Sequence, residues 1–109
     1  MTRGEIWMVD LGMAAKPRPC LILSVPYRDD EKAVVTYVAR TTQRRGGRFE
    51  IEHQAPHFLP GLFDAQNVGT VPEVRLMRFL TRLSAEKLAE VEAAVQLWLG
   101  FSTDSGSTR

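Results

Sequence analysis

An arginine held between two prolines is the residue best placed for chemistry in this chain. Arg18 follows Pro17 and precedes Pro19, directly before the apolar run at residues 20–23. A guanidinium is costly to remove from water and is rarely buried without a partner. Because the prolines on both sides of Arg18 restrict the backbone, we expect Arg18 to be a rigidly held cation at the start of a buried strand.

A pair of hydroxyls, Thr41 and Thr42, closes another strand-like run at residues 33–42. A guanidinium beside a hydroxyl suits a phosphodiester, because the first binds two phosphate oxygens and stabilises developing charge while the second donates one more hydrogen bond. The alternative is a structural salt bridge from Arg18 to Asp10 or Glu5. Composition and spacing alone favour this alternative, since most arginines are structural.

Other chemistries have weaker support in the sequence. His53 and His57 are four residues apart, but Pro56 rules out a helical pair and no cysteine or carboxylate cluster stands beside them. We therefore expect no metal site, and His53 to be a half-buried structural histidine. Cys20 lies in an apolar run and is expected in the core. No glycine-rich phosphate loop is present, and no cofactor is expected.

Basic residues gather in two parts of a chain whose formal net charge is only +1. A local basic patch steers anions more than the total charge does. The alternative is that these arginines are solvated residues of loops and strand edges with no binding role, and for any one arginine we weigh the two interpretations equally. The two groups are Arg40, Arg44, Arg45 and Arg48, and then Arg75, Arg78 and Arg82.

Length and composition describe one ordinary globular domain. The chain has 109 residues, of which 44% are hydrophobic and 25% charged. The single cysteine excludes an intramolecular disulfide, and no signal peptide or membrane-length apolar run is visible, so we expect a cytoplasmic protein. We expect one domain over residues 1–101 and a flexible polar tail over residues 102–109.

Short alternating runs predict a mainly β protein with one helix. A proline followed by Glu73 also predicts one or two helical turns at residues 72–77. Ser84 is the expected N-cap of a C-terminal helix that ends at Gly100, with an apolar stripe from Leu88 to Trp98. The result is a small, strongly curved sheet or open barrel that carries a helix. The strands are expected at residues 5–11, 20–25, 33–42, 48–53, 65–71 and 79–83.

Three segments resemble the opening strands of the MazF/PemK toxin family: RGEIWMVDL, PRPCLILS and VARTTQ. The resemblance continues through FEIE, PGLFD and LTRLSAEKLAEVEAAVQLWLG, and covers residues 3–101. It implies an SH3-like CcdB/PemK barrel of five to seven short strands with a C-terminal helix. It also implies a homodimer that acts as the toxin of a toxin–antitoxin pair and binds a cognate antitoxin.

The same resemblance implies an endoribonuclease that cuts single-stranded RNA, including mRNA, at short sequences without a metal. The ribose 2′-hydroxyl attacks the adjacent phosphorus and leaves a 2′,3′-cyclic phosphate and a 5′-hydroxyl. The matching positions make Arg18 and Thr41 the catalytic residues. The candidate RNA contacts in this chain are Thr42, Gln43, Arg40, Arg44, Arg45 and Arg48.

The chain departs from the family pattern in two places. The loop at residues 12–16 is short and lacks the glutamate common there, and Gly69 stands where an arginine is frequent. Two alternatives therefore stay open: a non-enzymatic CcdB-like gyrase inhibitor acting through Trp98 and Phe101, and a degenerate member that only binds its antitoxin.

Overall fold

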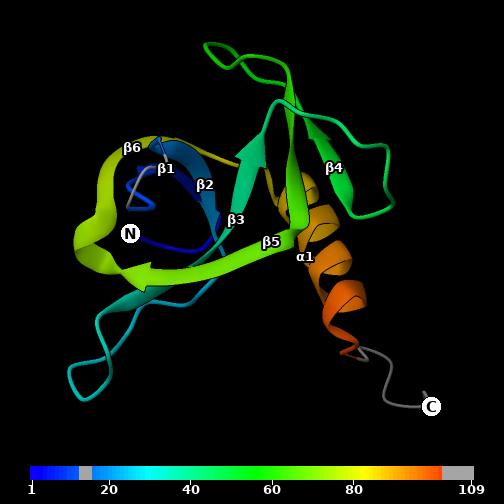
Figure 1. Cartoon of the computed structure of the whole chain (residues 1–109). Helices are drawn as coiled ribbons and strands as arrows, with labels where there is room; N and C mark the ends of the chain where they lie inside the picture. The colour runs from blue at the N-terminus through cyan, green and yellow to red at the C-terminus, as the bar shows by residue number, and fades with distance from the viewer. Residues whose placement is uncertain (13–15, 102–109) are drawn as a thin grey trace.

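Six antiparallel strands and a C-terminal helix form the part of the chain that the computed structural model describes, residues 1–12 and 16–101. The strands lie in the order β4-β5-β3-β2-β1-β6 and curve strongly, with α1 (Ala85–Leu99) beside β4 and β5 (Figure 1). This confirms the expected mainly β fold with a terminal helix. The strands are β1 (Glu5–Val9), β2 (Arg18–Ile22), β3 (Val34–Thr41), β4 (Glu50–His53), β5 (Gly61–Pro72) and β6 (Leu76–Arg82).

The main difference from the sequence-based expectation lies around β5. The strand expected at residues 65–71 begins earlier, because Gly61 already pairs with His53 and opens β5. A Cβ at Gly61 would lie 2.7 Å from the Thr41 carbonyl oxygen, so only glycine allows this close approach. Of the one or two helical turns expected at residues 72–77, the structure has a single 3₁₀ turn, η1 (Glu73–Arg75). Leu76 instead pairs with Val9, because strand pairing outweighs the local helix signal.

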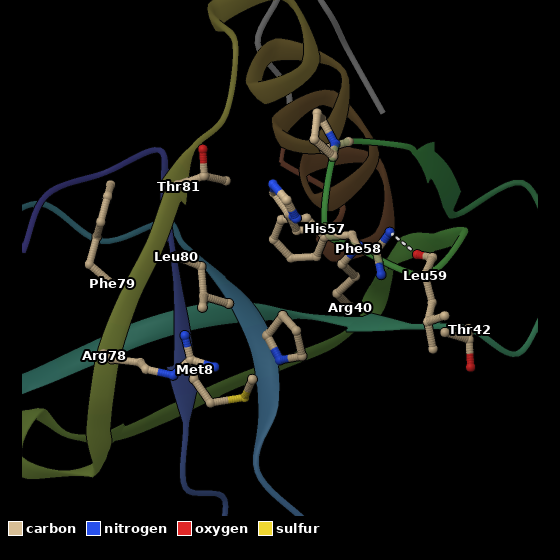
Figure 2. A pocket seen from close by; sticks show the side chains of 13 residues that line it. Met8, Arg40, Thr42, His57, Phe58, Leu59, Arg78, Phe79, Leu80 and Thr81 are labelled. Atoms are coloured by element: carbon tan, nitrogen blue, oxygen red, sulfur yellow. Dashed lines mark hydrogen bonds between the residues drawn. The ribbon is translucent and has the colours of Figure 1, made fainter.

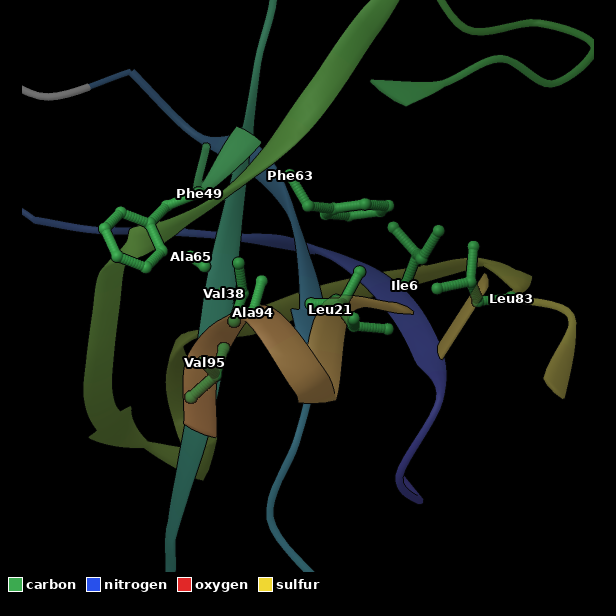
Figure 3. Packing of buried hydrophobic residues seen from close by; sticks show 10 residues of the cluster. Ile6, Leu21, Val38, Phe49, Phe63, Ala65, Leu83, Ala94 and Val95 are labelled. Carbon is green, nitrogen blue, oxygen red and sulfur yellow. The ribbon is translucent and has the colours of Figure 1, made fainter. Parts of the chain in front are cut away.

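Alternation along β3 divides the apolar residues between two sides of the curved sheet. Val38 belongs to the larger cluster, which packs against α1 and includes Phe63 and Val95 (Figure 3). Its neighbours Tyr37 and Ala39 belong to a smaller cluster on the opposite face. Since side chains two residues apart share a face, Thr41 belongs to the second face and Arg40 to the first.

The C-terminal helix begins and ends as its sequence predicts. The Ser84 hydroxyl accepts a hydrogen bond of 3.2 Å from the Lys87 N–H, and Gly100 adopts the left-handed conformation at φ 77°. Val95 is buried, whereas Trp98 is 45% exposed and meets Phe49 edge-on with ring centroids 5.4 Å apart. No helix in residues 1–12 and 16–101 is long and apolar enough to cross a membrane.

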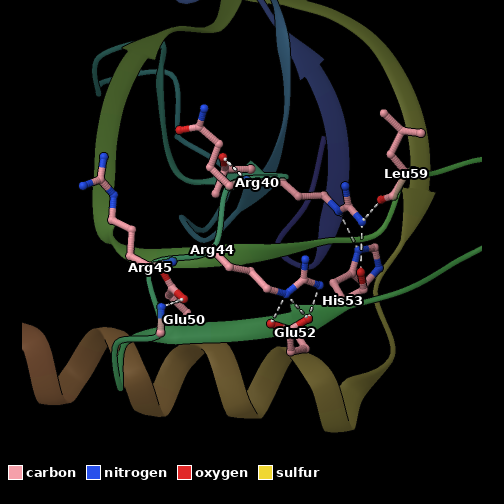
Figure 4. A network of polar contacts seen from close by, with 10 residues as sticks. Arg40, Arg44, Arg45, Glu50, Glu52, His53 and Leu59 are labelled. Atoms are coloured by element: carbon pink, nitrogen blue, oxygen red, sulfur yellow. Dashed lines mark hydrogen bonds and ion pairs between the residues drawn. The ribbon is translucent and has the colours of Figure 1, made fainter.

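Arg40 is buried rather than part of an exposed basic surface as expected, although it lines two cavities that Thr42 also lines. It is 4% exposed, and its Nε donates to His53 Nδ1 at 2.8 Å (Figure 4). Its Nη2 donates to the carbonyl oxygens of His53 and Leu59 at 2.9 and 2.7 Å. Arg40 therefore ties the segment before β5 to the sheet, and these contacts explain why a cation is tolerated in the core.

His53 accepts the Arg40 hydrogen bond, which requires Nδ1 to be unprotonated. Burial, then the charges of Arg40 and Lys87, lower the pKa of His53 from 6.5 to about 4. The unfolded chain therefore takes up a proton near pH 6.5, whereas the native protein does so only near pH 4. This histidine stabilises the fold above its ordinary pKa, and that contribution declines as the pH falls from 6.5 toward 4.

We predict that the melting temperature falls between pH 6.5 and pH 5, by roughly 4–8 °C for each kcal/mol lost. His53→Asn keeps an acceptor near the Nδ1 position but cannot titrate, so its melting temperature should depend less on pH over this range. Differential scanning calorimetry of both proteins provides the comparison. Equal slopes would contradict the assignment of a neutral, hydrogen-bonded His53.

Candidate active site

Arg18 begins β2 and Thr41 ends β3, at the same end of this strand pair. The register pairs Cys20 with Ala39, and its continuation by two residues would bring Arg18 opposite Thr41. Both side chains therefore belong to the face that carries the smaller apolar cluster. Both residues also line the same two cavities. The structure thus brings together the two residues that the sequence singled out.

The structural alternative for Arg18 is absent from the described part of the chain. Asp10 pairs with Arg75 at 3.3 Å, and Glu5 pairs with Arg82 at 3.1 Å. Among residues 1–12 and 16–101, the Arg18 side chain makes no ion pair or hydrogen bond. A half-buried guanidinium without such a partner is suited to binding an anion from outside.

Thr41 is oriented by the main chain of the turn that follows it. Its hydroxyl oxygen accepts a hydrogen bond of 3.1 Å from the Gln43 N–H. Because this bond uses an oxygen lone pair, the hydroxyl hydrogen stays available to donate. Thr41 can therefore offer a hydrogen bond to an anion that Arg18 also contacts.

A polar cavity of about 330 Å³ contains this pair. It shares lining residues with a smaller cavity of about 200 Å³ and with a larger groove of about 620 Å³. The larger groove is mostly apolar, and its lining is drawn in Figure 2. Thr42 lines all three and so marks where they meet. The polar cavity is lined by Arg18, Thr41, Thr42, Gln43, Arg45, Glu50, Asp64 and Asn67.

The basic turn between β3 and β4 is exposed, but its arginines are not equivalent. The Arg44 Nε donates to Glu52 at 3.0 Å, and this hydrogen bond lowers the pKa of Glu52 (Figure 4). The Arg48 guanidinium lies over the Phe49 ring, 4.7 Å from its centroid. Of Arg44, Arg45 and Arg48, only Arg45 lines the polar cavity. Arg45 is therefore the arginine of this turn nearest to the Arg18–Thr41 pair.

Three cavity residues were missed by the sequence-based analysis: Glu50, Asp64 and Asn67. Glu50 and Asp64 are cross-strand partners in β4 and β5. Asp64 and Asn67 lie where the β3–β5 register shifts, between the pairs Arg40–Phe63 and Val38–Val68. Such bulges are frequent beside active sites because they redirect side chains. The only sequence signal was an acid interrupting the apolar run at residues 62–65.

Comparison with known proteins identifies the family. The family model described as "PemK-like, MazF-like toxin of type II toxin-antitoxin system" matches residues 2–99. The chain belongs to this family. A curated relative, "Probable endoribonuclease MazF2" of Mycobacterium tuberculosis, is 36% identical over 98 residues, covering 83% of this chain and 89% of the relative.

Solved structures of the family share the fold of this MazF-like toxin. An endoribonuclease in complex with its cognate antitoxin, from a mycobacterial species, is 25% identical with a TM-score of 0.81, covering 95% of this chain and 99% of that one. A MazE–MazF structure from Deinococcus radiodurans is 22% identical with a TM-score of 0.79, covering 94% and 97%. The protein is thus a homologue of MazF proteins that are described as endoribonucleases or probable endoribonucleases.

One departure from the family pattern has a structural explanation. Gly69 pairs with Tyr37 across β3 and β5, and a Cβ at this position would collide with the Tyr37 phenol. The tyrosine ring therefore occupies the space that a side chain at residue 69 would need. The other departure, the short loop after β1, lies partly outside the described residues, at 13–15.

Cys20 is the single cysteine of this MazF-like toxin, and its buried position confirms that it belongs to the core. Cys20 is fully buried, and burial raises its pKa to about 12, so it stays protonated at neutral pH. Within the described ranges, no group of three or more His, Cys, Asp or Glu side chains is arranged to hold a metal ion.

We predict that the two neighbouring arginines differ in their effect on stability. Arg18→Ala should change the free energy of unfolding by no more than about 0.5 kcal/mol, because no described hydrogen bond or ion pair of the side chain is lost. Arg40→Ala should cost about 3 kcal/mol, because it leaves His53 and two carbonyls unsatisfied in the core. Urea denaturation measures both. A large loss in Arg18→Ala would show that Arg18 serves the fold.

Proposed function

We propose that this protein is a metal-independent, sequence-specific endoribonuclease that cleaves single-stranded RNA, including mRNA, as the toxin of a toxin–antitoxin pair. The observation that carries the proposal is the convergence of Arg18 and Thr41 on one open polar cavity, with no described ion pair to Arg18. Membership of the PemK-like, MazF-like family supports it, as does similarity to a probable endoribonuclease.

The two residues have complementary roles in the proposed reaction. The ribose 2′-oxygen attacks the adjacent phosphorus, the 5′-oxygen leaves, and a 2′,3′-cyclic phosphate remains. Arg18 binds the nonbridging oxygens and stabilises the charge that they gain in the transition state. Thr41 donates a hydrogen bond to the same phosphate. Since a guanidinium stays protonated at neutral pH, Arg18 is assigned to charge stabilisation rather than to proton removal.

The connected cavities suggest a path for the RNA strand on both sides of the scissile phosphate. On one side, Gln43 and Arg45 line the polar cavity and supply polar and cationic contacts. On the other side, Phe58 and Phe79 line the larger groove and offer aromatic surfaces for bases (Figure 2). Thr42 contacts the strand where the cavities meet, while Arg44 and Arg48 flank the path from the exposed turn.

The antitoxin is the second proposed partner. A solved relative is described as an endoribonuclease in complex with its cognate antitoxin. An acidic antitoxin segment bound over the cavity that contains Arg18 would block access of RNA and form ion pairs with the arginines of the cavity. We also propose a homodimer, for which the exposed Leu97, Leu99 and Phe101 at the end of α1 offer apolar surface. The proposed substrate places the protein in the cytoplasm.

Cleavage of mixed-sequence RNA in the presence of EDTA tests the proposal directly. We expect cuts at a recurrent short motif, with 2′,3′-cyclic phosphate and 5′-hydroxyl ends identified by mass spectrometry. Arg18→Ala should lower the rate by about 10²–10³-fold, the effect typical of removing one transition-state donor. Asp30→Asn, on the exposed turn before β3, is the control for nonspecific effects.

Intact RNA in this assay would refute the nuclease assignment. The same preparation should then be tested for inhibition of gyrase supercoiling and for antitoxin binding. Inhibition would support the CcdB-like alternative, in which exposed residues at the end of α1 contact the target. Antitoxin binding alone would identify a degenerate toxin. Cleavage that persists in Arg18→Ala would contradict the role of Arg18.

The salt dependence of RNA binding tests the contribution of the basic turn. On a single strand, each neutralised phosphate contributes a slope of about −0.7 in log K against log salt. Arg45→Ala should reduce the steepness by about one such contact. The matched control, Arg28→Ala, changes an exposed arginine outside the three cavities and should leave the slope unaltered. Fluorescence anisotropy with a 2′-deoxy-substituted, uncleavable oligonucleotide measures both slopes; equal changes would contradict the prediction.

A further inference from the structure

We propose that Asp64 is the general base that takes the proton from the attacking ribose 2′-hydroxyl. This inference rests on the proposed ribonuclease function and deepens it. The reaction needs a proton acceptor, and neither Arg18 nor Thr41 is suited to that role. Asp64 is a carboxylate that lines the same polar cavity as both residues.

The sheet explains why Asp64 shares the face of the cavity. Thr41 pairs with Leu62 across β3 and β5, so these side chains share a face, and Asp64 follows two residues later on β5. The adjacent Phe63 and Ala65 belong to the core cluster on the opposite face. Asp64 is therefore directed away from the core and toward the side on which Thr41 lies.

Glu50 is the other carboxylate in this cavity, but its hydrogen bonds give it a structural role. Its two carboxylate oxygens accept hydrogen bonds of 2.9 Å from the main-chain N–H groups of Arg45 and Gly46, which shapes the basic turn. Asp64 accepts only one described hydrogen bond, from the Gln66 N–H to Oδ1 at 3.0 Å. Its Oδ2 is thus the carboxylate oxygen left to accept a proton in the part of the chain that the structure describes.

The charged groups around Asp64 come from three neighbouring elements. Glu50 lies directly opposite on β4, Arg18 lines the cavity from β2, and Arg45 lines it from the turn before β4. Asp64 therefore lies beside one carboxylate and two cations, and the two cations also attract the phosphate. The arrangement places a base and an anion-binding cation in one cavity without requiring the base to bind the phosphate.

The proposed step balances without a further reactant. The 2′-oxygen forms a bond to phosphorus as its proton moves to Asp64 Oδ2. The bond from phosphorus to the 5′-oxygen breaks, and the leaving oxygen takes a proton from water. Asp64 then returns its proton to solvent. The products are the cyclic phosphate and the 5′-hydroxyl.

Single-turnover cleavage by Asp64→Asn tests this assignment. The asparagine keeps an oxygen for the Gln66 N–H but cannot act as a base, so we expect the rate to fall by about 10²–10⁴-fold. Affinity for an uncleavable 2′-deoxy oligonucleotide should stay equal or increase, because one negative charge is removed. Asp64→Glu should recover part of the rate.

The outcomes separate this inference from the proposed function. Wild-type cleavage that Arg18→Ala abolishes but Asp64→Asn preserves would overturn the role of Asp64 alone. A large loss in Glu50→Gln without a loss in Asp64→Asn would assign the base to Glu50 and also overturn it. Equal losses of rate and of oligonucleotide affinity in Asp64→Asn would indicate a structural role. RNA left intact by the wild type would overturn both proposals.

Discussion

The antiparallel register of β2 and β3 is the constraint on which the proposed site depends. It brings Arg18 and Thr41 to one cavity, at the ends of two strands whose apolar residues hold them in place. The same period of two sends Arg40, one residue earlier, to the opposite face and into the core. A shift by one residue would move the Thr41 side chain to the core face and away from Arg18.

Four arginines near this register differ in function because their surroundings differ. Arg40 is buried and satisfied by His53 and main-chain carbonyls, so it stabilises the fold. Arg44 is exposed and paired with Glu52, whereas Arg45 lines the cavity. Arg18 has a half-buried position and no described ion pair, which makes it the cation best suited to an external phosphate. Net charge alone could not distinguish these roles.

The sequence allowed the fold class and the terminal helix to be predicted, because alternation and capping are local signals. The choice of Arg18 and Thr41 as a pair depended on the resemblance to the family, since composition and spacing alone favoured a structural role for Arg18. The burial of Arg40 could not be predicted, since its partner His53 and the Leu59 carbonyl come from a later part of the chain. Asp64 was missed for a related reason. Its place in the cavity depends on the pairing of β5 with β3 and β4, which brings together segments that lie far apart in the sequence.

A crystal structure with an oligonucleotide that carries a 2′-deoxy residue at the cleavage site would test the central claim most directly. Without the 2′-hydroxyl the strand cannot be cut, so the position of the scissile phosphate becomes visible. We predict that its nonbridging oxygens lie within hydrogen-bond distance of the Arg18 guanidinium and the Thr41 hydroxyl. A phosphate bound elsewhere, with Arg18 turned to a protein carboxylate, would contradict the account.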